Sequence, residues 1–291
     1  SAHGDWTSVG ALPSCLFMKS LLVSIVHILG ALVICALVFL VALYLYQDKM
    51  IFYPQKISLD KIEYISKLAN VEGITIRTKD GFDIKGWYIG NNSADRSKIL
   101  LYFGGNAEEV SYMIPEVTEF KNCSIVLMNY RGYGQSQGKP NENNLCGDAL
   151  VIYDYFIGRP ENKDSKIIIM GRSIGTGVAV FLAKNRRCNG VVLVSPYNDF
   201  KSLAQYHFPY LPVGPVIKYK FNSGERVPSI KSPLMIMLGT GDKTIPPEQS
   251  RLLAQKWGGR VTIKEFEGAD HNNLSTYREY WKFINDFIGT I

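Results

Sequence analysis

The stretch KIIIMGRSIGTGVAVFLAKN, residues 166–185, decides how this chain is interpreted. An apolar run of strand length, Lys166–Met170, leads into GRSIG at 171–175, and a helix-length segment rich in small residues follows. A G-x-S-x-G sequence between a strand and a helix is typical of a sharp, strained turn that exposes the serine hydroxyl above a sheet edge. We therefore predict that Ser173 is a nucleophile, with an incidental serine in a glycine-rich turn as the alternative.

On both sides of this stretch, short apolar runs alternate with segments of helix length. The runs are almost continuously apolar, as strands buried on both faces of a parallel sheet should be. A hairpin of Ile74–Thr78 and Phe82–Ile89 comes first. The strands predicted after it are Lys98–Phe103, Ser124–Asn129, Lys166–Met170, Val191–Val194, Leu234–Leu238 and Val261–Phe266. The helices are predicted near 108–120, 142–157, 175–186, 247–257 and 274–288. This order predicts a three-layer α/β sandwich with a mostly parallel sheet, whose active site lies at the carboxyl ends of the strands.

A serine nucleophile needs a general base, and the base needs an acid that orients it. His271 follows the last predicted strand, so it reaches the same sheet edge as Ser173, and we predict it as the base. Asp242 follows the strand Leu234–Leu238, and the order Ser, Asp, His along the chain matches a hydrolase order. We therefore predict Asp242 as the acid.

Three other titratable residues are alternatives for these roles. Asp199 follows the preceding strand. Asp270 is adjacent to His271 in sequence and is expected to cap its own loop instead of orienting the histidine. His207 lies in a segment of tyrosine, phenylalanine and proline, where a packed or surface histidine is the expected reading.

The oxyanion of an acyl-transfer reaction needs two backbone N–H donors. One is expected from Ile174, directly after the nucleophile. The other is expected from the loop GGNA at 104–107, where Asn106 is our choice, and an ordinary helix N-cap at Asn106 is the alternative. The glycine-punctuated loop Asn129–Ser136 is expected to support the site without taking part in the chemistry.

The N-terminal segment is apolar enough to be a membrane anchor. From Ser20 to Gln47 there are 28 residues without a charge, which at ~1.5 Å per residue can cross a ~30 Å hydrocarbon core. Tyr44 and Tyr46 lie at its end, as in an interfacial aromatic belt. A signal peptide is the alternative, but its apolar core would be shorter and would end in a small-residue cleavage site. We predict an uncleaved single-pass anchor at residues 20–47.

Residues 1–19 are expected to form an N-terminal tail. Met18-Lys19 resembles a natural start, which would make residues 1–17 an extension or an artefact. Lys19 precedes the apolar run, whereas Lys49, Lys56 and Lys61 follow it. This distribution leans toward a cytoplasmic C-terminal domain under the positive-inside rule, and the side of the membrane stays open.

Charge and cysteine usage exclude other classes of protein. The net charge of +6 is spread thinly, without a run of basic residues, so we expect no nucleic-acid partner. No CxxC pair and no Cys/His ligand spacing is present, and no P-loop lysine or complete dinucleotide motif occurs. We therefore expect no metal and no cofactor.

Several of these pieces together resemble the membrane-anchored Bem46-like group of α/β-hydrolases, which is similar to the animal alpha/beta-hydrolase domain-containing proteins thirteen and seventeen. The resemblance runs from about residue 40 to 288 and implies an α/β-hydrolase fold over residues 48–291. This chain has Gly104 where many relatives carry histidine, and it lacks the cysteine-rich N-terminus of the depalmitoylating animal members. The pieces that carry the resemblance are YFGGNA at 102–107, NYRGYG at 129–134, GRSIG at 171–175, Ser195-Pro196, Gly241-Asp242 and Asp270-His271-Asn272.

An insertion at about 198–232 is rich in tyrosine, phenylalanine and proline. It is expected to form either a small aromatic cap over Ser173, suited to an acyl chain, or a surface loop and helix with a satellite core of its own.

The whole sequence predicts a membrane-anchored serine hydrolase that cleaves an apolar carboxylic ester or thioester through an acyl-enzyme. Amide or peptide hydrolysis and a non-catalytic, membrane-tethered binding protein are the alternatives. The natural substrate, its acyl length and the oligomeric state stay open.

Overall fold

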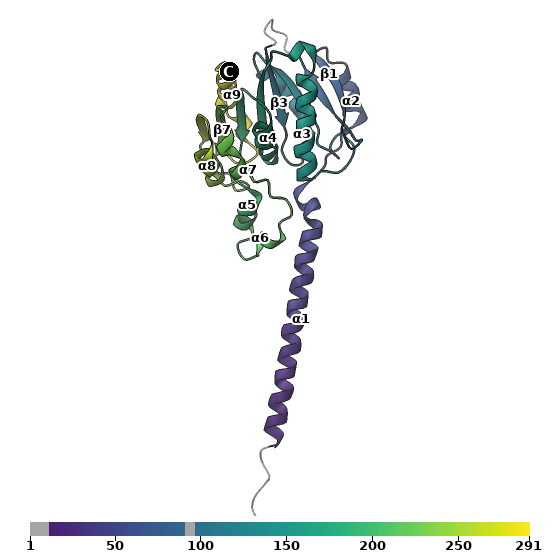
Figure 1. Cartoon of the computed structure of the whole chain (residues 1–291), viewed down its shortest axis with the longest axis vertical. Coiled ribbons are helices and arrows are strands. Elements are labelled where there is room, and N and C mark those ends of the chain that lie inside the picture. Colours follow the sequence, from purple (N-terminus) through teal and green to yellow (C-terminus); the bar gives the residue numbers. More distant parts are fainter. Residues whose placement is uncertain (1–11, 91–96) are drawn as a thin grey trace, which may run out of the picture. The chain divides into compact units, whose positions relative to one another are not determined.

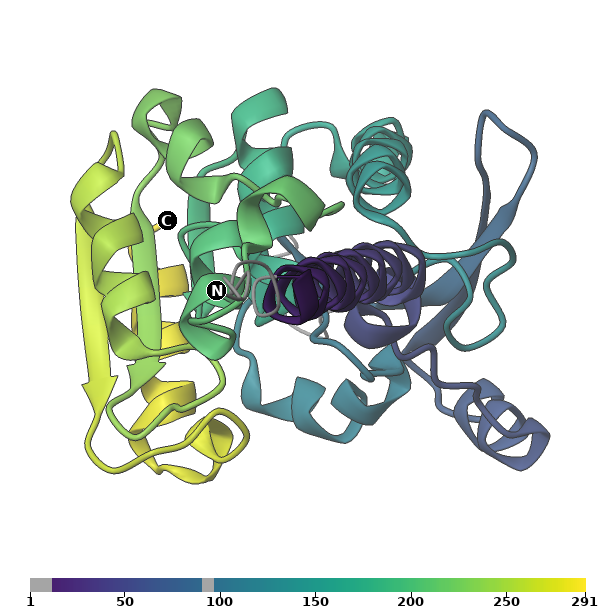
Figure 2. The same ribbon diagram turned by 90° about the horizontal axis from the view of Figure 1, so that it is seen from below.

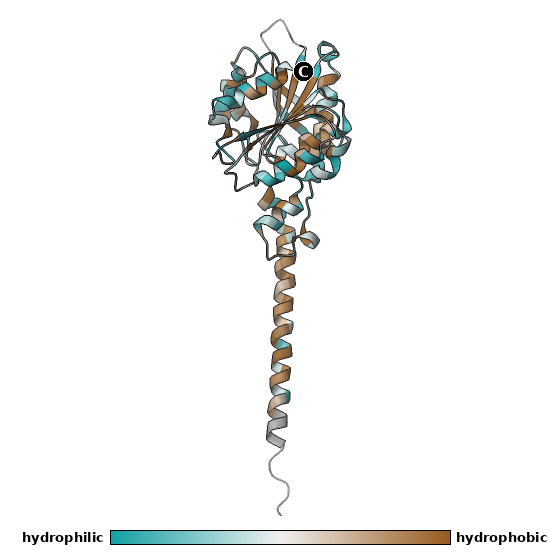
Figure 3. Ribbon diagram, turned by 90° about the vertical axis from the view of Figure 1, so that its left-hand side faces the viewer, coloured by the Kyte–Doolittle hydropathy of each residue, from teal (hydrophilic) through white to brown (hydrophobic). Residues whose placement is uncertain are grey.

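A computed structural model describes residues 12–90 and 97–291 (Figure 1). The chain divides into two units, Ser1–Gln47 and Asp48–Ile291. The first unit contains most of helix α1, Leu12–Ile51, which continues into the second. Figure 3 shows this helix hydrophobic over nearly its whole length. The stretch Phe17–Ile51 is long and apolar enough to cross a membrane, and the most apolar part of it buries nothing against the protein. A helix that is apolar all round and packs on no core is typical of a membrane span.

The second unit is built on one sheet. Within the described residues, eight strands lie in the order β1-β2-β4-β3-β5-β6-β7-β8. The pairs β1–β2 and β2–β4 are antiparallel, and all other neighbours are parallel. The strands are β1 Val71–Arg77, β2 Asp83–Ile89, β3 Lys98–Phe103, β4 Ser124–Met128, β5 Lys166–Arg172, β6 Gly190–Val194, β7 Leu234–Gly239 and β8 Val261–Phe266.

Helices cover both faces of this sheet, so the predicted three-layer α/β sandwich with a mostly parallel sheet is confirmed. One core cluster joins one face of the strands to α3 (Glu142–Ile157), α4 (Ile174–Asn185) and α8 (Pro247–Lys256). A second cluster joins the other face to α2, α9 and the 3-10 segment η1. Figure 2 shows α3 on one side of the sheet, and η1, η2 and the yellow helix α9 on the other. The remaining bounds are α2 Leu59–Ser66, η1 Val110–Met113, η2 Pro115–Glu119 and α9 Glu279–Gly289.

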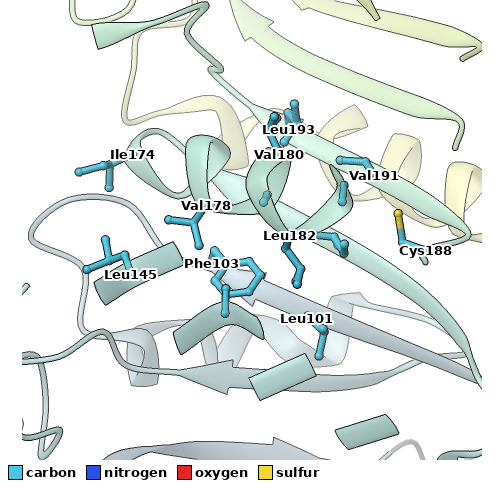
Figure 4. Close-up of a cluster of buried hydrophobic side chains, with 14 of the residues drawn as sticks. Leu101, Phe103, Leu145, Ile174, Val178, Val180, Leu182, Cys188, Val191 and Leu193 are labelled. Atoms are coloured by element: carbon cyan, nitrogen blue, oxygen red, sulfur yellow. The ribbon is translucent and has the colours of Figure 1, made fainter. Parts of the chain in front are cut away.

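Helix α4 is held in the centre of this sandwich. Its side chains Val178, Val180 and Leu182 are fully buried, and Figure 4 shows Val178 and Leu182 near Phe103 and Leu101 of β3. Burying one such aliphatic side chain stabilises the fold by about 1.5–3 kcal/mol. The packing therefore fixes the first turn of α4 and, with it, the residue that precedes the helix.

The insertion contains short helices and a root that is buried in the main core. Tyr219, Phe221 and Val227 belong to the large core cluster, and the ring of Phe221 lies 4.8 Å from that of Phe200. Its elements are α5 Phe200–His207, α6 Val213–Val216, α7 Ser223–Arg226 and η4 Val227–Ser229. The root thus shares the core of the sandwich, whereas α5 has no buried residue.

Three sequence expectations need correction. The helix predicted near 108–120 is two 3-10 segments, because Pro115 lacks the N–H that an α-helix would use there. The helix predicted over 274–288 begins at Glu279, since Asn273 instead accepts the N–H of Asp270 and extends the preceding loop. Strand β8 is mostly exposed because it lies at the edge of the sheet, and helix α2 was not predicted.

A buried ion pair fixes the loop that follows β4. The side chains of Arg131 and Asp148 are each about 6% exposed. Arg131 donates from Nε and Nη2 to the two oxygens of Asp148, with both distances 2.7 Å. Burial raises the pKa of the Asp148 carboxyl, and the guanidinium opposes that rise. Arg131 also donates to the two oxygens of Asp80, at 2.6 and 2.9 Å, whereas the buried Asp148 carboxylate is paired with Arg131.

We expect Asp148→Asn to lower the free energy of unfolding by about 2 kcal/mol, because it removes the buried carboxylate and leaves the Arg131 guanidinium with Asp80 alone, which is half-exposed. Thermal or urea unfolding of the detergent-solubilised protein measures this. Asp154→Asn is the matched control, since Asp154 lies on the same helix and binds Arg186 with the same two-bond geometry at an exposed position. The control should lose less than about 1 kcal/mol, and equal losses would contradict the argument from burial.

Candidate active site

The serine turn is strained and depends on its two glycines. Ser173 has φ 52° and ψ −121°, a conformation that non-glycine residues rarely adopt. A Cβ on Gly171 would lie 2.5 Å from the carbonyl oxygen of Gly175, and a Cβ on Gly175 would lie 2.1 Å from that of Phe103. Both distances are impossible for real atoms, so only glycine fits at either position. The turn therefore needs the sequence G-x-S-x-G for steric reasons.

The structure brings Ser173, His271 and Asp242 together at the carboxyl ends of β5, β8 and β7. His271 Nε2 lies 2.9 Å from Ser173 Oγ, and His271 Nδ1 lies 2.7 Å from Asp242 Oδ2. Asp242 is buried, whereas Ser173 and His271 are half-buried. The hydroxyl, the imidazole and the carboxylate thus form one continuous hydrogen-bonded chain.

The surroundings of Asp242 keep it ionised. Its Oδ1 accepts the backbone N–H groups of Thr244 and Ile245 at 2.9 and 2.8 Å. Burial opposes ionisation, but the hydrogen bond and charge of His271, together with the N–H of Ile245, lower the pKa of Asp242 below its ordinary value. An ionised Asp242 accepts a hydrogen bond from the Nδ1–H of His271, so that the lone pair of the neutral imidazole is on Nε2, which faces Ser173.

The alternative residues have other partners. Asp199 caps α5, accepting the N–H of Ser202 at 2.7 Å. Asp270 accepts the N–H groups of the next two residues, Asn272 and Asn273, at 2.8 and 3.0 Å. His207 is exposed, and its Nε2 lies 2.9 Å from the carbonyl oxygen of Thr244. Each of these residues therefore has a local structural role.

The two predicted oxyanion donors lie on either side of the serine turn. Ile174 is the first residue of α4, so its N–H points out of the helix N-terminus. The loop after β3 passes close by, since a Cβ on Gly105 would lie 3.6 Å from Ser173 Cβ. Asn106 is not a helix N-cap, because Glu109 caps η1. Its side-chain Oδ1 accepts the N–H of Tyr53 and that of Ala107, at 3.0 and 2.9 Å.

An ion pair that the sequence did not predict joins the loops of the site. Glu108 Oε2 accepts the N–H of Gly105 at 2.7 Å and binds Arg172 Nη1 at 3.2 Å. Arg172 Nη2 donates to Asn272 Oδ1 at 3.1 Å. Arg172 precedes Ser173, and Asn272 follows His271. One carboxylate and one guanidinium therefore tie together the loop after β3, the serine turn and the histidine loop.

The loop Asn129–Ser136 supports the same region, as the sequence indicated. The hydroxyl of Tyr130 donates to the carbonyl oxygen of Gly104 at 2.9 Å. The hydroxyl of Tyr133 lies 3.1 Å from Asn106 Oδ1. Both contacts act on the loop that carries the second predicted oxyanion donor, so they restrict its position.

Other nucleophiles and metal ligands are poorly placed in the described part of the chain. Residues 12–90 and 97–291 contain no group of three or more His, Cys, Asp or Glu side chains that could hold a metal ion. Burial raises the pKa of Cys123 and of Cys146 to about 12 each. These two thiols are therefore not thiolate nucleophiles at neutral pH.

Residues 121–280, more than half of the chain, match the protein family described as alpha/beta hydrolase domain. The chain belongs to this family. It is similar to protein bem46 of Schizosaccharomyces pombe, with 29% identity over 263 residues that cover 84% of this chain and 87% of that protein. It is also similar to alpha/beta hydrolase domain-containing protein 17C of Xenopus laevis, with 31% identity over 65% of this chain and 60% of that protein. The expected resemblance to the Bem46-like group is therefore confirmed.

Two further comparisons bear on the anchor and the fold. A protein of Saccharomyces cerevisiae described as an uncharacterized membrane protein is 27% identical, over 89% of this chain and 95% of that protein. The solved structure of the Pyrococcus furiosus esterase Pf2001 matches with a TM-score of 0.65 at 18% identity, over 82% of this chain and 99% of that one. At this identity the structural match shows the shared fold alone.

We expect Asp242→Asn to lower ester turnover by roughly 10³- to 10⁴-fold, because the amide favours the wrong tautomer of His271. Asp270→Asn and Asp199→Asn are matched controls that should stay within about tenfold, or ~1.4 kcal/mol of barrier. Steady-state kinetics measures the three variants, and their melting temperatures verify folding. If Asp242→Asn kept most of its turnover and Asp199→Asn lost it, the acid of the triad would be Asp199, which follows the preceding strand.

Proposed function

We propose that this chain is a membrane-anchored serine hydrolase that cleaves a carboxylic ester or thioester through an acyl-enzyme. The observation that carries the proposal is the hydrogen-bonded chain from Ser173 Oγ through His271 to the ionised Asp242, with distances of 2.9 and 2.7 Å. A serine, a histidine and an ionised carboxylate in this arrangement support nucleophilic attack on a carbonyl carbon.

In the first half of the reaction, Ser173 Oγ attacks the carbonyl carbon while His271 Nε2 takes the hydroxyl proton. Charge then develops on the carbonyl oxygen, and the backbone N–H groups of Ile174 and Asn106 stabilise it. The imidazolium gives its proton to the leaving oxygen or sulfur as the bond between that atom and the carbonyl carbon breaks. The carbonyl re-forms, the alcohol or thiol departs, and the acyl group stays on Ser173. Asp242 remains ionised throughout and stabilises the imidazolium.

In the second half, water replaces the alcohol or thiol. His271 Nε2 takes a proton from the water as its oxygen attacks the acyl carbon, and the same two N–H groups hold the second oxyanion. Collapse of this intermediate breaks the acyl–Oγ bond, and His271 gives the proton back to Ser173. Water is consumed, a carboxylic acid is released, and the enzyme returns to its starting state.

The relatives support an ester as the bond that is cleaved. Pf2001 is described as an esterase, and this chain shares its fold. An amide could be attacked by the same three residues, so amide hydrolysis is the second candidate. A binding protein without catalysis is disfavoured by the strained Ser173 turn, because strain of about 1–3 kcal/mol without a function would be costly to keep.

The apolar helix supports a division of the chain into an anchor and a catalytic domain. We place the membrane span at residues 20–47 and the hydrolase domain at 48–291, with the insertion at about 198–232. The candidate span Phe17–Ile51 supports this placement, and so does the description of the yeast relative as a membrane protein. The three residues of the proposed triad all lie beyond residue 48.

We expect Ser173→Ala to lower ester turnover by on the order of 10⁴-fold or more, because the nucleophile is lost. p-Nitrophenyl esters of increasing chain length measure turnover and acyl preference, and a fluorophosphonate probe labels the nucleophile in the membrane fraction. The parent should be labelled and the variant should not. A variant that keeps turnover within tenfold of the parent and still takes up the probe would refute the assignment.

We expect removal of residues 1–47 to give a soluble protein that keeps its ester turnover, since the second unit begins at Asp48. Centrifugation and p-nitrophenyl ester kinetics measure both properties. The full chain should instead stay in membranes washed with alkaline carbonate. Release by carbonate would contradict the anchor, and an inactive truncation would show that the helix contributes to the domain.

A further inference from the structure

The insertion exposes aromatic side chains at one short segment. Tyr206 and Phe208 are 58% and 47% exposed, and Tyr210 is 97% exposed. We call residues 206–210 the insertion tip. Gln205 Nε2 lies within 3.1–3.2 Å of the carbonyl oxygens of Phe208, Pro209 and Leu211, which holds the turn in shape. Three aromatic rings exposed within five residues form a local apolar patch that a partner surface could cover.

The root of the insertion is bound to the point at which the chain leaves the apolar helix. Asp48 is the first residue after the charge-free run that ends at Gln47. Lys218 Nζ lies 2.7 Å from Asp48 Oδ1, and the hydroxyl of Tyr219 donates to the same oxygen. The ring of Tyr219 also packs edge-on against Phe52, with centroids 5.1 Å apart. These contacts hold Lys218 and Tyr219, at the root of the insertion, beside the first residue after the proposed membrane span.

The charge of the insertion suits a lipid surface. Residues 198–232 carry five basic and two acidic side chains. Lys201 and Lys220 are exposed, and they lie on the same insertion as the aromatic tip, whereas Lys218 is paired with Asp48. Segments with aromatic rings and neighbouring lysines bind at the headgroup level of a membrane. The rings lie in the interface, and the ammonium groups lie near lipid phosphates.

The same insertion contacts the loop that carries Asp242, which we call the acid loop. His207, inside the tip, lies 2.9 Å from the carbonyl oxygen of Thr244, and the N–H of Thr244 donates to Asp242. A membrane contact at the tip would therefore bring the edge of the sheet that carries Ser173 close to the lipid. An ester or thioester at headgroup level, whose acyl chain lies in the bilayer, could then reach the serine without leaving the membrane.

We infer that the insertion tip docks into the interface of the membrane that residues 20–47 cross, and that the enzyme takes acyl esters or thioesters directly from that bilayer. This inference rests on the proposed anchor and the proposed hydrolase activity. It adds a second, peripheral contact with the lipid and assigns the substrate to the membrane phase.

The first experiment locates the tip without using catalysis. The full chain carrying Tyr210→Trp is reconstituted in phosphatidylcholine–phosphatidylserine vesicles, with or without bromine on the acyl chains, and the parent's fluorescence is subtracted. Interfacial helices and loops enter by about 5–10 Å, so we expect the new indole to be quenched at least about twofold more than a control. Tyr64→Trp is the matched control, since Tyr64 is 65% exposed on α2. Figure 1 shows α2 at the opposite end of the domain from α5 and α6.

Equal quenching in the two variants would overturn the inference. The insertion tip would then face water, or contact a second copy of the chain or another protein. If alkaline carbonate released the protein from the same vesicles, the proposed membrane anchor would be refuted. The two failures are therefore distinguishable.

The second experiment tests the source of the substrate. The triple variant Tyr206→Ser, Phe208→Ser, Tyr210→Ser should lower turnover of a long-chain ester embedded in the vesicles by about tenfold, because docking is lost. Turnover of a short, water-soluble ester should be unchanged, since the variant leaves the three residues of the proposed triad intact. Equal turnover of the embedded ester by variant and parent would overturn the inference. If the parent cleaved neither ester, the hydrolase proposal would be refuted. The membrane contact of the insertion tip would then be tested by the quenching experiment alone.

Discussion

The close approach of three backbone segments at the serine turn is the constraint on which the site depends. Gly175 lies against the carbonyl groups of Phe103 and Gly104, so that any side chain there would collide with backbone. The start of α4, the end of β5 and the loop after β3 are therefore fixed relative to one another by a single contact. The strain at Ser173 costs about 1–3 kcal/mol, and the buried apolar face of α4 offsets it.

Parallel strand order and one ion pair position the other loops of the site relative to the serine turn. Because β5, β7 and β8 run in the same direction, the loops that follow them open at one edge of the sheet. That order alone does not fix the positions of the loops relative to one another. The Glu108–Arg172 pair removes much of this freedom, since it binds the backbone of Gly105 and, through Asn272, the histidine loop.

The sequence predicted the elements whose signals are local and missed those that depend on distant partners. Strands β3 and β8 begin and end where the apolar runs do, and α3 matches its predicted bounds. The exposure of β8 depends on its place at the sheet edge, which an apolar run does not reveal. Ser173, His271 and Asp242 could be singled out because each follows a strand. The pairing of Arg172 with Glu108 could not, because 64 residues separate them and no local pattern signals a contact between the two.

The insertion and the acid loop differ in how firmly they are held, and this difference bears on catalysis. Helix α5 has no buried residue, but Phe200 and Leu203 pack against the core cluster, so its exposed C-terminal end at His207 is held less firmly than its start. Its contact with the acid loop is made to the carbonyl oxygen of Thr244, whereas Asp242 is held by the N–H groups of Thr244 and Ile245. A displacement of α5 would thus break the His207 contact and leave the hydrogen bonds of Asp242 in place. The position of the carboxylate beside His271 therefore depends on the loop that carries Asp242 and not on the insertion.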